Sequence, residues 1–289
     1  MNFKEKIQKN RFVITGEIGP PKGTDLAGVY KSADVFKKHV DAVNVTDLQS
    51  SVMRLNSLTV SRLLLEKDIE PICQFTTRDR NRLALQSDLL SAYVLGIRNV
   101  VVMTGDHPTL GDHPKAKPVY DLDSIKLLDV ISRLNKGEDL SGNKLNAPSD
   151  LFCGSVVNPG ADPIDPEIIK MHKKVKVGAK FFQTQAIFNT EIFLDFMERI
   201  KDVKVPIIAG IVLLKSDKMA KYMNENVPGV DVPEPLIKKM EATKDRKKTA
   251  IEIAVDTINK IKDKVQGVHL MTIGLDELVP EIVERIRVK

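Results

Sequence analysis

The sequence predicts a single (β/α)8 barrel, and three observations support this prediction. Eight short apolar runs end at Gly, Pro, Asn or Asp, which is the pattern of strands buried on both faces of a parallel sheet. At least one helical stretch separates each run from the next, and strict alternation of strand and helix is typical of the TIM barrel. The alternative is a doubly wound open sheet, but the stretch Gly16 to Pro21 after the first run is not a glycine-rich phosphate turn. The predicted strands are residues 12–17, 41–46, 70–75, 99–104, 151–157, 179–185, 206–213 and 267–273.

Helices are predicted where apolar side chains recur every three or four residues. After the sixth run, Phe193, Phe196 and Ile200 follow the i, i+3, i+7 spacing of a helix with one buried face. A longer helix near the end carries an apolar stripe over residues 251–265 and opens in the basic run 244–248. Besides the long helix near the end, the clear helical stretches are residues 27–39, 80–95, 122–134 and 190–200, the last of which contains Phe193, Phe196 and Ile200.

Two connections are longer than the others. Residues 135–150 are polar and join the fourth helix to the fifth strand, so we expect a surface loop on the face away from the active site. Residues 214–244 contain two short helical pieces, around 217–224 and 234–243, and long insertions after a strand tend to be lids or binding loops. Because neither stretch reads as a domain linker, we expect residues 1–289 to form one domain with an insertion after the seventh strand.

Charge and cysteine content narrow the possible functions. The chain has 44 basic and 39 acidic residues, but its lysines are spread along helices and are not grouped with aromatic residues, which argues against nucleic-acid binding. Cys73 and Cys153 lie in apolar runs and are expected to be reduced core residues of a cytoplasmic protein. We expect neither a signal peptide nor a membrane span. Two cysteines are too few for an iron–sulfur cluster, so any such centre would lie on a partner.

In a TIM barrel the active site lies at the carboxyl ends of the strands. The residues at these positions are rich in carboxyl, hydroxyl and amide groups and poor in metal ligands. This composition predicts hydrogen bonding to a flat molecule with many heteroatoms. The positions are Glu17, Thr46 with Asp47, Gln74 to Thr77, Thr104 to Asp106, Asn158, Gln183 with Gln185, and the segment after Leu213.

Glu17 and Asp106 are the main candidates for chemistry, since each follows a buried strand and stands next to a break containing Gly and Pro. Glu17 is either a general acid that faces the barrel mouth or a residue that bonds loop amides. Asp106 is either a functional carboxylate or a turn residue.

Other polar residues carry weaker signals. Gly-Asp-His-Pro occurs at residues 105–108 and again at 111–114, but this spacing matches no common zinc pattern, so no metal site is predicted. His39, His172 and His269 stand in helix or strand patterns without an evident partner and are expected to be structural.

The residues at the strand ends resemble those of the methylenetetrahydrofolate reductase family, which are flavin-dependent TIM barrels. The similarity runs over most of the chain, and the order of the motifs along successive strand ends makes it specific. The residues that carry it are Glu17 before Pro20 and Pro21, Val43 to Thr46, Gly105 to Pro108, and Val177 to Ala179 leading to Gln183, Thr184, Gln185 and Phe188.

The resemblance implies roles for these side chains. Glu17 looks like the acid that protonates the bridging nitrogen of 5,10-methylenetetrahydrofolate, which opens to an iminium and takes hydride from reduced flavin to give 5-methyltetrahydrofolate. Asp106 resembles the carboxylate that bonds the pterin and tunes the flavin, and Gln185, with Gln183, looks like the amide contact to folate. The resemblance also implies flavin contacts from Thr46, Gln74, Thr104, Gly105, Asp106, Tyr120, Asn158, Ala161, Lys173 and Lys174.

The chain departs from better-known members of the family at several of these positions. Gln74 and Thr104 stand where His and Arg are usual, so the flavin is FAD or FMN. The loop Leu214 to Asp217 lacks the aromatic residue that stacks on nicotinamide, and Gly274 with Leu275 replaces an Arg that pairs with the folate tail, which leaves direct use of NADH open.

The sequence looks closer to reductases of anaerobic one-carbon pathways, which often work with a cysteine-rich subunit that delivers electrons, and we expect an oligomer. Two other functions remain open. One is a pterin-binding barrel that transfers a methyl or formyl group without redox chemistry, with Asp106 and Asn158 as clamps. The other is a subunit that keeps the fold without catalysis.

Overall fold

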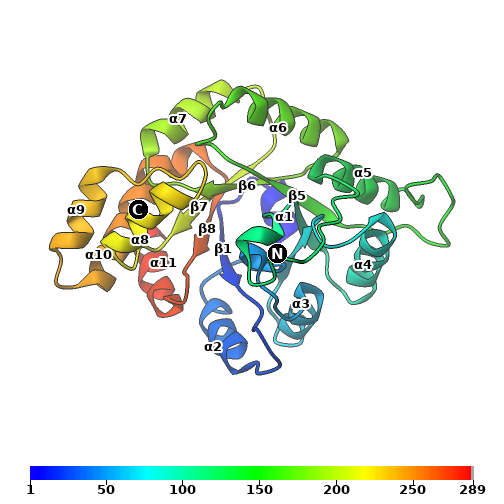
Figure 1. The fold of residues 1–289 in the computed structure, drawn as a ribbon, viewed down its shortest axis with the longest axis horizontal. Coiled ribbons are helices and arrows are strands. Elements are labelled where there is room, and N and C mark those ends of the chain that lie inside the picture. The colour runs from blue at the N-terminus through cyan, green and yellow to red at the C-terminus, as the bar shows by residue number, and fades with distance from the viewer. Residues whose placement is uncertain (288–289) are drawn as a thin grey trace.

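The computed structural model describes residues 1–287 and shows a closed barrel of eight parallel strands (Figure 1). The strands follow one another around the ring in sequence order, and β1 also pairs with β8, which closes the ring. The predicted TIM barrel is confirmed, each strand lying within three residues of its predicted bounds, and the open-sheet alternative is wrong. The strands are β1 (Val13–Ile18), β2 (Ala42–Val45), β3 (Pro71–Thr76), β4 (Asn99–Met103), β5 (Phe152–Val157), β6 (Phe182–Ala186), β7 (Ile207–Val212) and β8 (Gly267–Met271).

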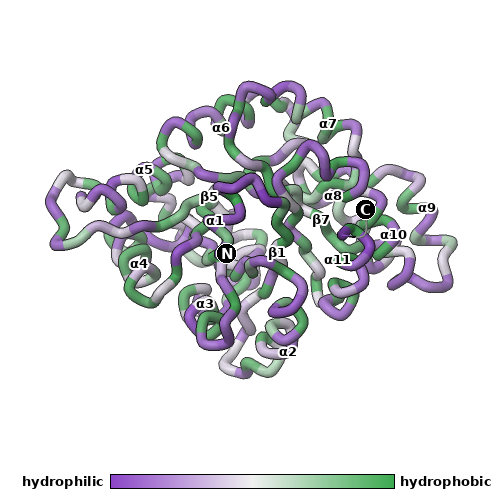
Figure 2. Tube along the Cα trace, turned by 180° about the vertical axis from the view of Figure 1, so that it is seen from behind, coloured by the Kyte–Doolittle hydropathy of each residue, from purple (hydrophilic) through white to green (hydrophobic). Residues whose placement is uncertain are grey.

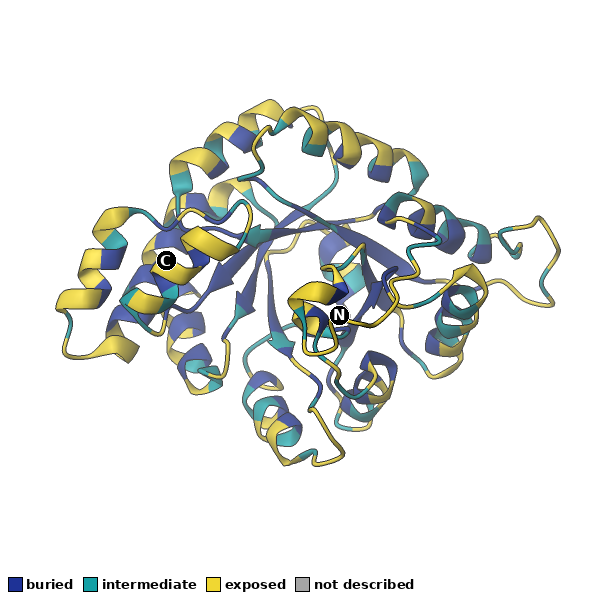
Figure 3. Ribbon diagram, in the orientation of Figure 1, coloured by how far each residue is buried: buried dark blue, intermediate teal, exposed yellow. Residues whose placement is uncertain are grey.

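Helices surround the strands, with buried inner faces and exposed outer faces (Figure 3). Several begin at an Asn or Asp whose side chain accepts the first free backbone N–H groups, as Asn81, Asp123 and Asn189 do. The predicted helix over residues 27–39 is shorter than expected, because the chain turns after Phe36 to enter β2. The surrounding helices are α2 (Ala27–Phe36), α3 (Ser57–Leu65), α4 (Arg82–Val94), α5 (Ser124–Leu134), α6 (Asp165–Val177), α7 (Thr190–Arg199), α10 (Arg246–Ile261) and α11 (Val279–Arg287).

Most strand residues are buried on both faces, which explains why strands such as β7 read as nearly continuous apolar runs (Figure 2). In β4, Val100 and Val102 face the helices while Val101 faces the barrel interior. The interior is tight enough to require glycine at Gly154, where an added Cβ atom would lie 2.5 Å from the ring of Phe181. Along each strand, side chains therefore alternate between the core that packs against the helices and the barrel interior.

A short N-terminal helix, α1 (Phe3–Gln8), seals the amino end of the barrel and was not predicted. In Figure 1 it lies across the middle of the ring. Its Phe3 ring is fully buried, with ring centroids 6.2 Å from Phe152 and 5.3 Å from Phe181. Asn2 caps the helix, and its capping box with Glu5 fixes the first turn. The apolar plug leaves the carboxyl end of the barrel as the mouth.

The long connection after β7 contains α8 (Asp217–Asn226) and α9 (Glu234–Ala242), as the two predicted helical pieces indicated. These helices lie beside α10 at one side of the barrel (Figure 1) and share an apolar cluster of their own. Residues 135–150 join α5 to β5 as an irregular loop with one short bridge, Glu138 to Lys144.

Both cysteines are buried, as predicted. Burial raises the pKa of the Cys73 thiol to about 12 and also raises the pKa of the Cys153 thiol, so both are protonated at neutral pH. In the part of the chain that the structure describes, helices long and apolar enough to cross a membrane are absent.

Replacing the plug residue should destabilise the barrel. We expect Phe3→Ala to lower the free energy of unfolding by about 3–5 kcal/mol, because it leaves a cavity between Phe152 and Phe181. Urea denaturation followed by circular dichroism measures the change. Phe12→Ala is the control, since that ring is 41% exposed. Equal losses in the two variants would contradict a plug role for Phe3.

Candidate active site

A layer of buried polar side chains lies above the plug and below the mouth. Strands β1, β2, β3, β6 and β8 each place one such residue at an inward-facing position. Most buried amide and hydroxyl groups in proteins are paired by hydrogen bonds. Its members are Thr15, Asn44, Gln74, Gln183 and His269.

Glu17 lies at the carboxyl end of β1 with its carboxyl group in the mouth. Its side chain is 13% exposed, so it is shielded but reachable from solvent. The amide of Gln49 donates to Oε1 at 3.3 Å, and Nε2 of His269 lies 3.3 Å from Oε2. The expectation that His269 lacks a partner is therefore wrong. Glu17 thus bonds one loop amide, that of the Gln49 side chain, as well as the imidazole of His269.

Asp106 lies two residues beyond Thr104 in the loop after β4, and its side chain is exposed. Its backbone carbonyl accepts hydrogen bonds from Ser51 Oγ at 3.0 Å, Arg78 Nη1 at 3.2 Å and Tyr120 Oη at 3.3 Å. These bonds fix the backbone while the carboxylate stays free of protein hydrogen bonds within residues 1–287. Such a carboxylate is available to a bound molecule.

Arg78 holds the loops of the mouth together, and the sequence did not point to it. Its side chain is only 2% exposed and bonds the carboxylate of Asp79 and the carbonyls of Leu48 and Asp106. Leu48 has a positive φ of 47°, and Ser50 and Ser51 follow with 55° and 57°. Left-handed backbone at three non-glycine residues costs energy, and strain of this kind is concentrated at functional sites.

Gln183 spans the barrel interior and pairs with Asn44. The Asn44 amide donates to Gln183 Oε1 at 2.6 Å, and the Gln183 amide donates back to Asn44 Oδ1 at 3.1 Å. The two residues come from β2 and β6, four strands apart in the ring, so this pair crosses the barrel and forms a polar floor under the mouth. Gln183 was expected to contact folate, but the structure gives its amide a protein partner.

Gln185 lies two residues further along β6, half-buried at an irregularity in the pairing with β7. Its Oε1 accepts from the backbone N–H of Ala186 at 3.0 Å. Its NH2 group makes no hydrogen bond to the part of the chain that the structure describes. The amide is thus oriented and keeps donors for a ligand.

The predicted flavin contacts divide into three groups. Gly105 and Tyr120 lie together with Asp106, since the Tyr120 hydroxyl also donates to the Gly105 carbonyl at 3.4 Å. Asn158 and Ala161 lie in the loop after β5, where the Asn158 amide donates to Pro228 of the insertion at 3.0 Å. The remaining residues are Thr46 and Gln74, both buried, Thr104 and Lys173, both exposed, and Lys174, which is buried.

Two buried groups in this set fit a polar cofactor. The hydroxyl oxygen of Thr46 is buried and has no hydrogen-bond partner among residues 1–287. The Lys174 ammonium donates to the carbonyl of Val156 at 2.6 Å, and burial lowers the pKa of this lysine. Buried polar groups with spare bonding capacity are suited to a ligand rich in oxygen and nitrogen.

Two acidic residues near the mouth have structural partners instead. Asp47 accepts from the Thr76 backbone N–H at 2.8 Å and pairs with the Arg80 guanidinium. Asp112, in the second Gly-Asp-His-Pro motif, pairs with Lys22 at 2.5 Å and accepts from the Met53 backbone N–H at 3.0 Å. These bonds lower the pKa of Asp112 and tie the loops after β1, β2 and β4 together. Within the described residues, clusters of three or more potential metal ligands are absent.

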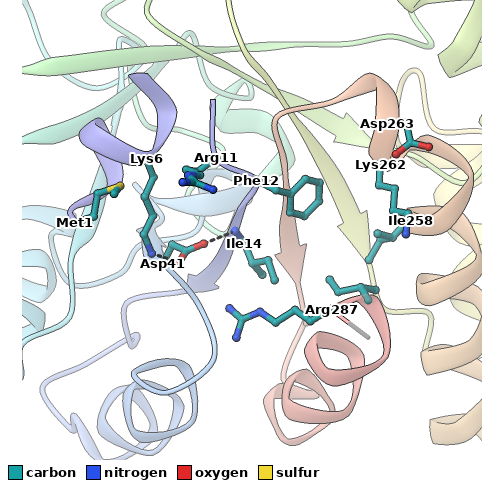
Figure 4. A pocket seen from close by; sticks show the side chains of 11 residues that line it. Met1, Lys6, Arg11, Phe12, Ile14, Asp41, Ile258, Lys262, Asp263 and Arg287 are labelled. Carbon is teal, nitrogen blue, oxygen red and sulfur yellow. Dashed lines mark hydrogen bonds and ion pairs between the residues drawn. The ribbon is translucent and has the colours of Figure 1, made fainter. Parts of the chain in front are cut away.

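A cleft lies at the opposite end of the barrel, between α1, the start of β1, α10 and α11 (Figure 4). Its volume is about 660 Å³. Because TIM-barrel sites lie at the carboxyl ends of the strands, this cleft does not bear on the mouth. It is lined by Met1, Lys6, Arg11, Phe12, Ile14, Asp41, Ile258, Lys262, Asp263, Ile286 and Arg287.

Comparison with known protein families shows which family this chain belongs to. The family model described as methylenetetrahydrofolate reductase matches residues 2–287. The chain belongs to the methylenetetrahydrofolate reductase family. This membership agrees with the resemblance carried by the strand-end motifs.

Members of the methylenetetrahydrofolate reductase family with curated names are distant in sequence. The chain is 27% identical over 243 residues to methylenetetrahydrofolate reductase 2 of Schizosaccharomyces pombe, covering 79% of this chain and 37% of that one. It is 24% identical over 293 residues to 5,10-methylenetetrahydrofolate reductase of Salmonella typhimurium, covering 96% and 93%. The chain therefore spans less than half of two Schizosaccharomyces pombe relatives, 37% of methylenetetrahydrofolate reductase 2 and 47% of methylenetetrahydrofolate reductase 1, and 93% of the Salmonella typhimurium protein.

A solved structure with the same fold is that of an uncharacterized protein from Clostridium thermocellum, which binds two copies of 5-methyl-5,6,7,8-tetrahydrofolic acid. The TM-score is 0.68 at 19% identity, over 99% of this chain and 98% of that one. At this identity the likeness establishes the shared fold.

The pair that crosses the barrel should be energetically coupled. We expect Gln183→Ala to lower the free energy of unfolding by about 1–3 kcal/mol, because it leaves the buried Asn44 amide without its partner. The double variant with Asn44→Ala should lose less than the sum of the single losses, as measured by urea denaturation. Gln185→Ala, at a half-buried position, is the control and should change stability little. Strictly additive losses at residues 44 and 183 would show that the pair is not coupled.

Proposed function

We propose that the chain reduces 5,10-methylenetetrahydrofolate to 5-methyltetrahydrofolate with a bound flavin, using Glu17 as the general acid. The observation that supports this most directly is the shielded carboxyl group of Glu17 at the carboxyl end of β1, in a barrel of this family. A proton donor is needed there because the substrate's ring opens only when one of its nitrogens leaves as an amine.

In the proposed reaction Glu17 gives its proton to the bridging nitrogen of the substrate. The carbon–nitrogen bond breaks, its electron pair stays on that nitrogen, and the carbon becomes part of an iminium cation. The carboxylate left on Glu17 faces this positive charge from a site with little water, where it stabilises the cation more than bulk solvent would. Asp106, whose backbone is fixed and whose carboxylate is free, would bond the pterin, and the NH2 group of Gln185 would donate to folate.

The residues that would hold the flavin are those around Thr46, Gly105 and Tyr120, with Lys174 as the buried cation. When bound, reduced flavin supplies the hydride that the iminium carbon accepts. The flavin is FAD or FMN. Leu214, at the place of the nicotinamide-stacking aromatic, is 1% exposed and packs into the apolar cluster of the insertion. Direct use of NADH and electron delivery by a cysteine-rich partner subunit both stay candidate routes to the reduced flavin.

The colour of the purified protein tests the proposal. We expect a yellow protein with flavin absorbance, and heat release followed by mass measurement should give FAD or FMN. The reduced protein should convert 5,10-methylenetetrahydrofolate to the methyl form. A colourless protein that binds the pterin and transfers a methyl or formyl group would instead support the non-redox alternative, and one that does neither would support a subunit without catalysis.

Replacing the carboxyl group of Glu17 with an amide should separate reduction of the flavin from reduction of the folate. We expect Glu17→Gln to keep the flavin and its reduction by dithionite while folate reduction falls by about 100- to 10,000-fold, the usual contribution of a general acid. Stopped-flow absorbance measures both steps in one sample. Folate reduction within a few-fold of wild type would rule out the assignment.

The Gln185 amide should contribute to folate affinity. We expect Gln185→Ala to weaken folate binding by about 1–3 kcal/mol, the cost of removing a hydrogen-bond partner from a shielded polar group. Calorimetric titration measures the dissociation constant. Gln8→Ala on α1, at the other end of the barrel, is the matched control and should bind folate normally. Unchanged affinity in Gln185→Ala would assign this residue to structure alone.

A further inference from the structure

A continuous hydrogen-bonded chain runs from the polar layer of the barrel to Glu17. Thr15 and His269 sit opposite one another on the neighbouring strands β1 and β8. Nδ1 of His269 lies 3.0 Å from Thr15 Oγ1, and its Nε2 lies 3.3 Å from Glu17 Oε2. The imidazole is only 3% exposed, so it is held between these two side chains and away from water.

The Thr15 hydroxyl contacts Nδ1 of His269, and the Glu17 carboxyl group contacts Nε2. The 3.0 Å contact between Thr15 Oγ1 and Nδ1 allows either partner to donate. The Val268 carbonyl, 3.5 Å from Oγ1, offers the hydroxyl another acceptor, which favours Nδ1–H as the donor to Oγ1. A neutral imidazole has one protonated nitrogen. In the tautomer with Nδ1 protonated, Nε2 presents a lone pair to Glu17, and the ring takes up a second proton at Nε2.

The two oxygens of Glu17 are also distinguished by their neighbours. The Gln49 amide donates to Oε1, which makes this oxygen an acceptor, so a proton on the carboxyl group belongs on Oε2. Oε2 is the oxygen that faces the free nitrogen of His269. The carboxyl group and the imidazole thus compete for one proton at one contact.

Few other charges bear on this contact. Across from His269, β7 presents Gly210, which has no side chain, and β1 presents Thr15. The other inward positions of β8 are Gly267 and Met271, which do not ionise. Within residues 1–287, Glu17 is the ionisable side chain that pairs with His269. The state of the imidazole is therefore coupled to that carboxyl group.

We propose that Glu17 and His269 form a dyad that shares one transferable proton at the contact between Oε2 and Nε2, with His269 as the positioning residue that holds this proton beside Glu17. This rests on the proposed function. The stored proton lies on Oε2 or on Nε2. When Oε2 passes it to the substrate nitrogen, the dyad is left as a carboxylate and a neutral imidazole, and solvent restores one proton after product leaves. An isolated glutamic acid is largely deprotonated at pH 7, so it would reach the substrate unloaded.

The pH dependence of single-turnover folate reduction tests the dyad. We expect His269→Gln, which keeps a hydrogen-bonding group beside Glu17 but cannot store a proton, to be slowed about 10- to 100-fold at pH 7 and to recover toward wild type near about pH 5. Flavin content and folate binding should stay normal. His172→Gln, at an exposed histidine on α6, is the matched control and should follow the wild-type profile. A rate lowered by the same factor at every pH, or not lowered at all, would overturn the proposal.

A second measurement does not depend on turnover, so failure of the proposed function is distinguished from failure of the dyad. Protein with ¹⁵N-labelled histidine rings shows which nitrogen is protonated, and His269→Gln identifies the signal among the five histidines. We expect Nδ1 to stay protonated while Nε2 titrates, and Glu17→Gln to shift that titration. A neutral His269 with its proton on Nε2 would overturn the dyad even in a protein with no folate activity.

Discussion

The architecture depends on the closure of eight parallel strands, each of which turns every second side chain into one interior. Inside the closed barrel, different kinds of side chain occupy different levels along the barrel axis. Aromatic and aliphatic side chains fill the amino end around Phe3, paired amides and hydroxyls fill the middle, and Glu17 stands at the mouth. A shielded carboxyl group can be kept there because apolar side chains fill the level below it, and because Asn44 and Gln183 satisfy each other's amide groups.

The loops of the mouth are held by a few concentrated interactions. Arg78 gathers carbonyls from two loops at left-handed or glycine-rich positions, and Asp112 joins three loops by ionic and backbone bonds. Gly105 has a φ of +87°, and a side chain there would crowd Thr76 and Arg78. The backbone that carries Asp106 is therefore set before any ligand arrives, which lowers the entropic cost of binding.

Strands and strand-end residues could be predicted from the sequence because burial on both faces and the breaks after each run are local signals. Partners across the barrel could not, since Asn44 and Gln183 are 139 residues apart and meet only when the ring closes. His269 was assigned to structure for the same reason: its partner Glu17 lies 252 residues away. The alternation of side chains along β2 offered one clue to the inward position of Asn44, because it places Asn44 on the same face as Thr46. Helix α1 escaped notice because its six residues are too few for a clear period.

Closure also limits how another chain can attach. With β1 paired to β8, every strand in residues 1–287 has two neighbours, so the sheet that these residues form has no open edge on which a foreign strand could be added. A protein that binds to this barrel must therefore contact the side chains of its helices or loops. Single substitutions can change the side chains on these surfaces without altering the pairing of the strands. The binding partner can therefore differ among relatives that share the same barrel.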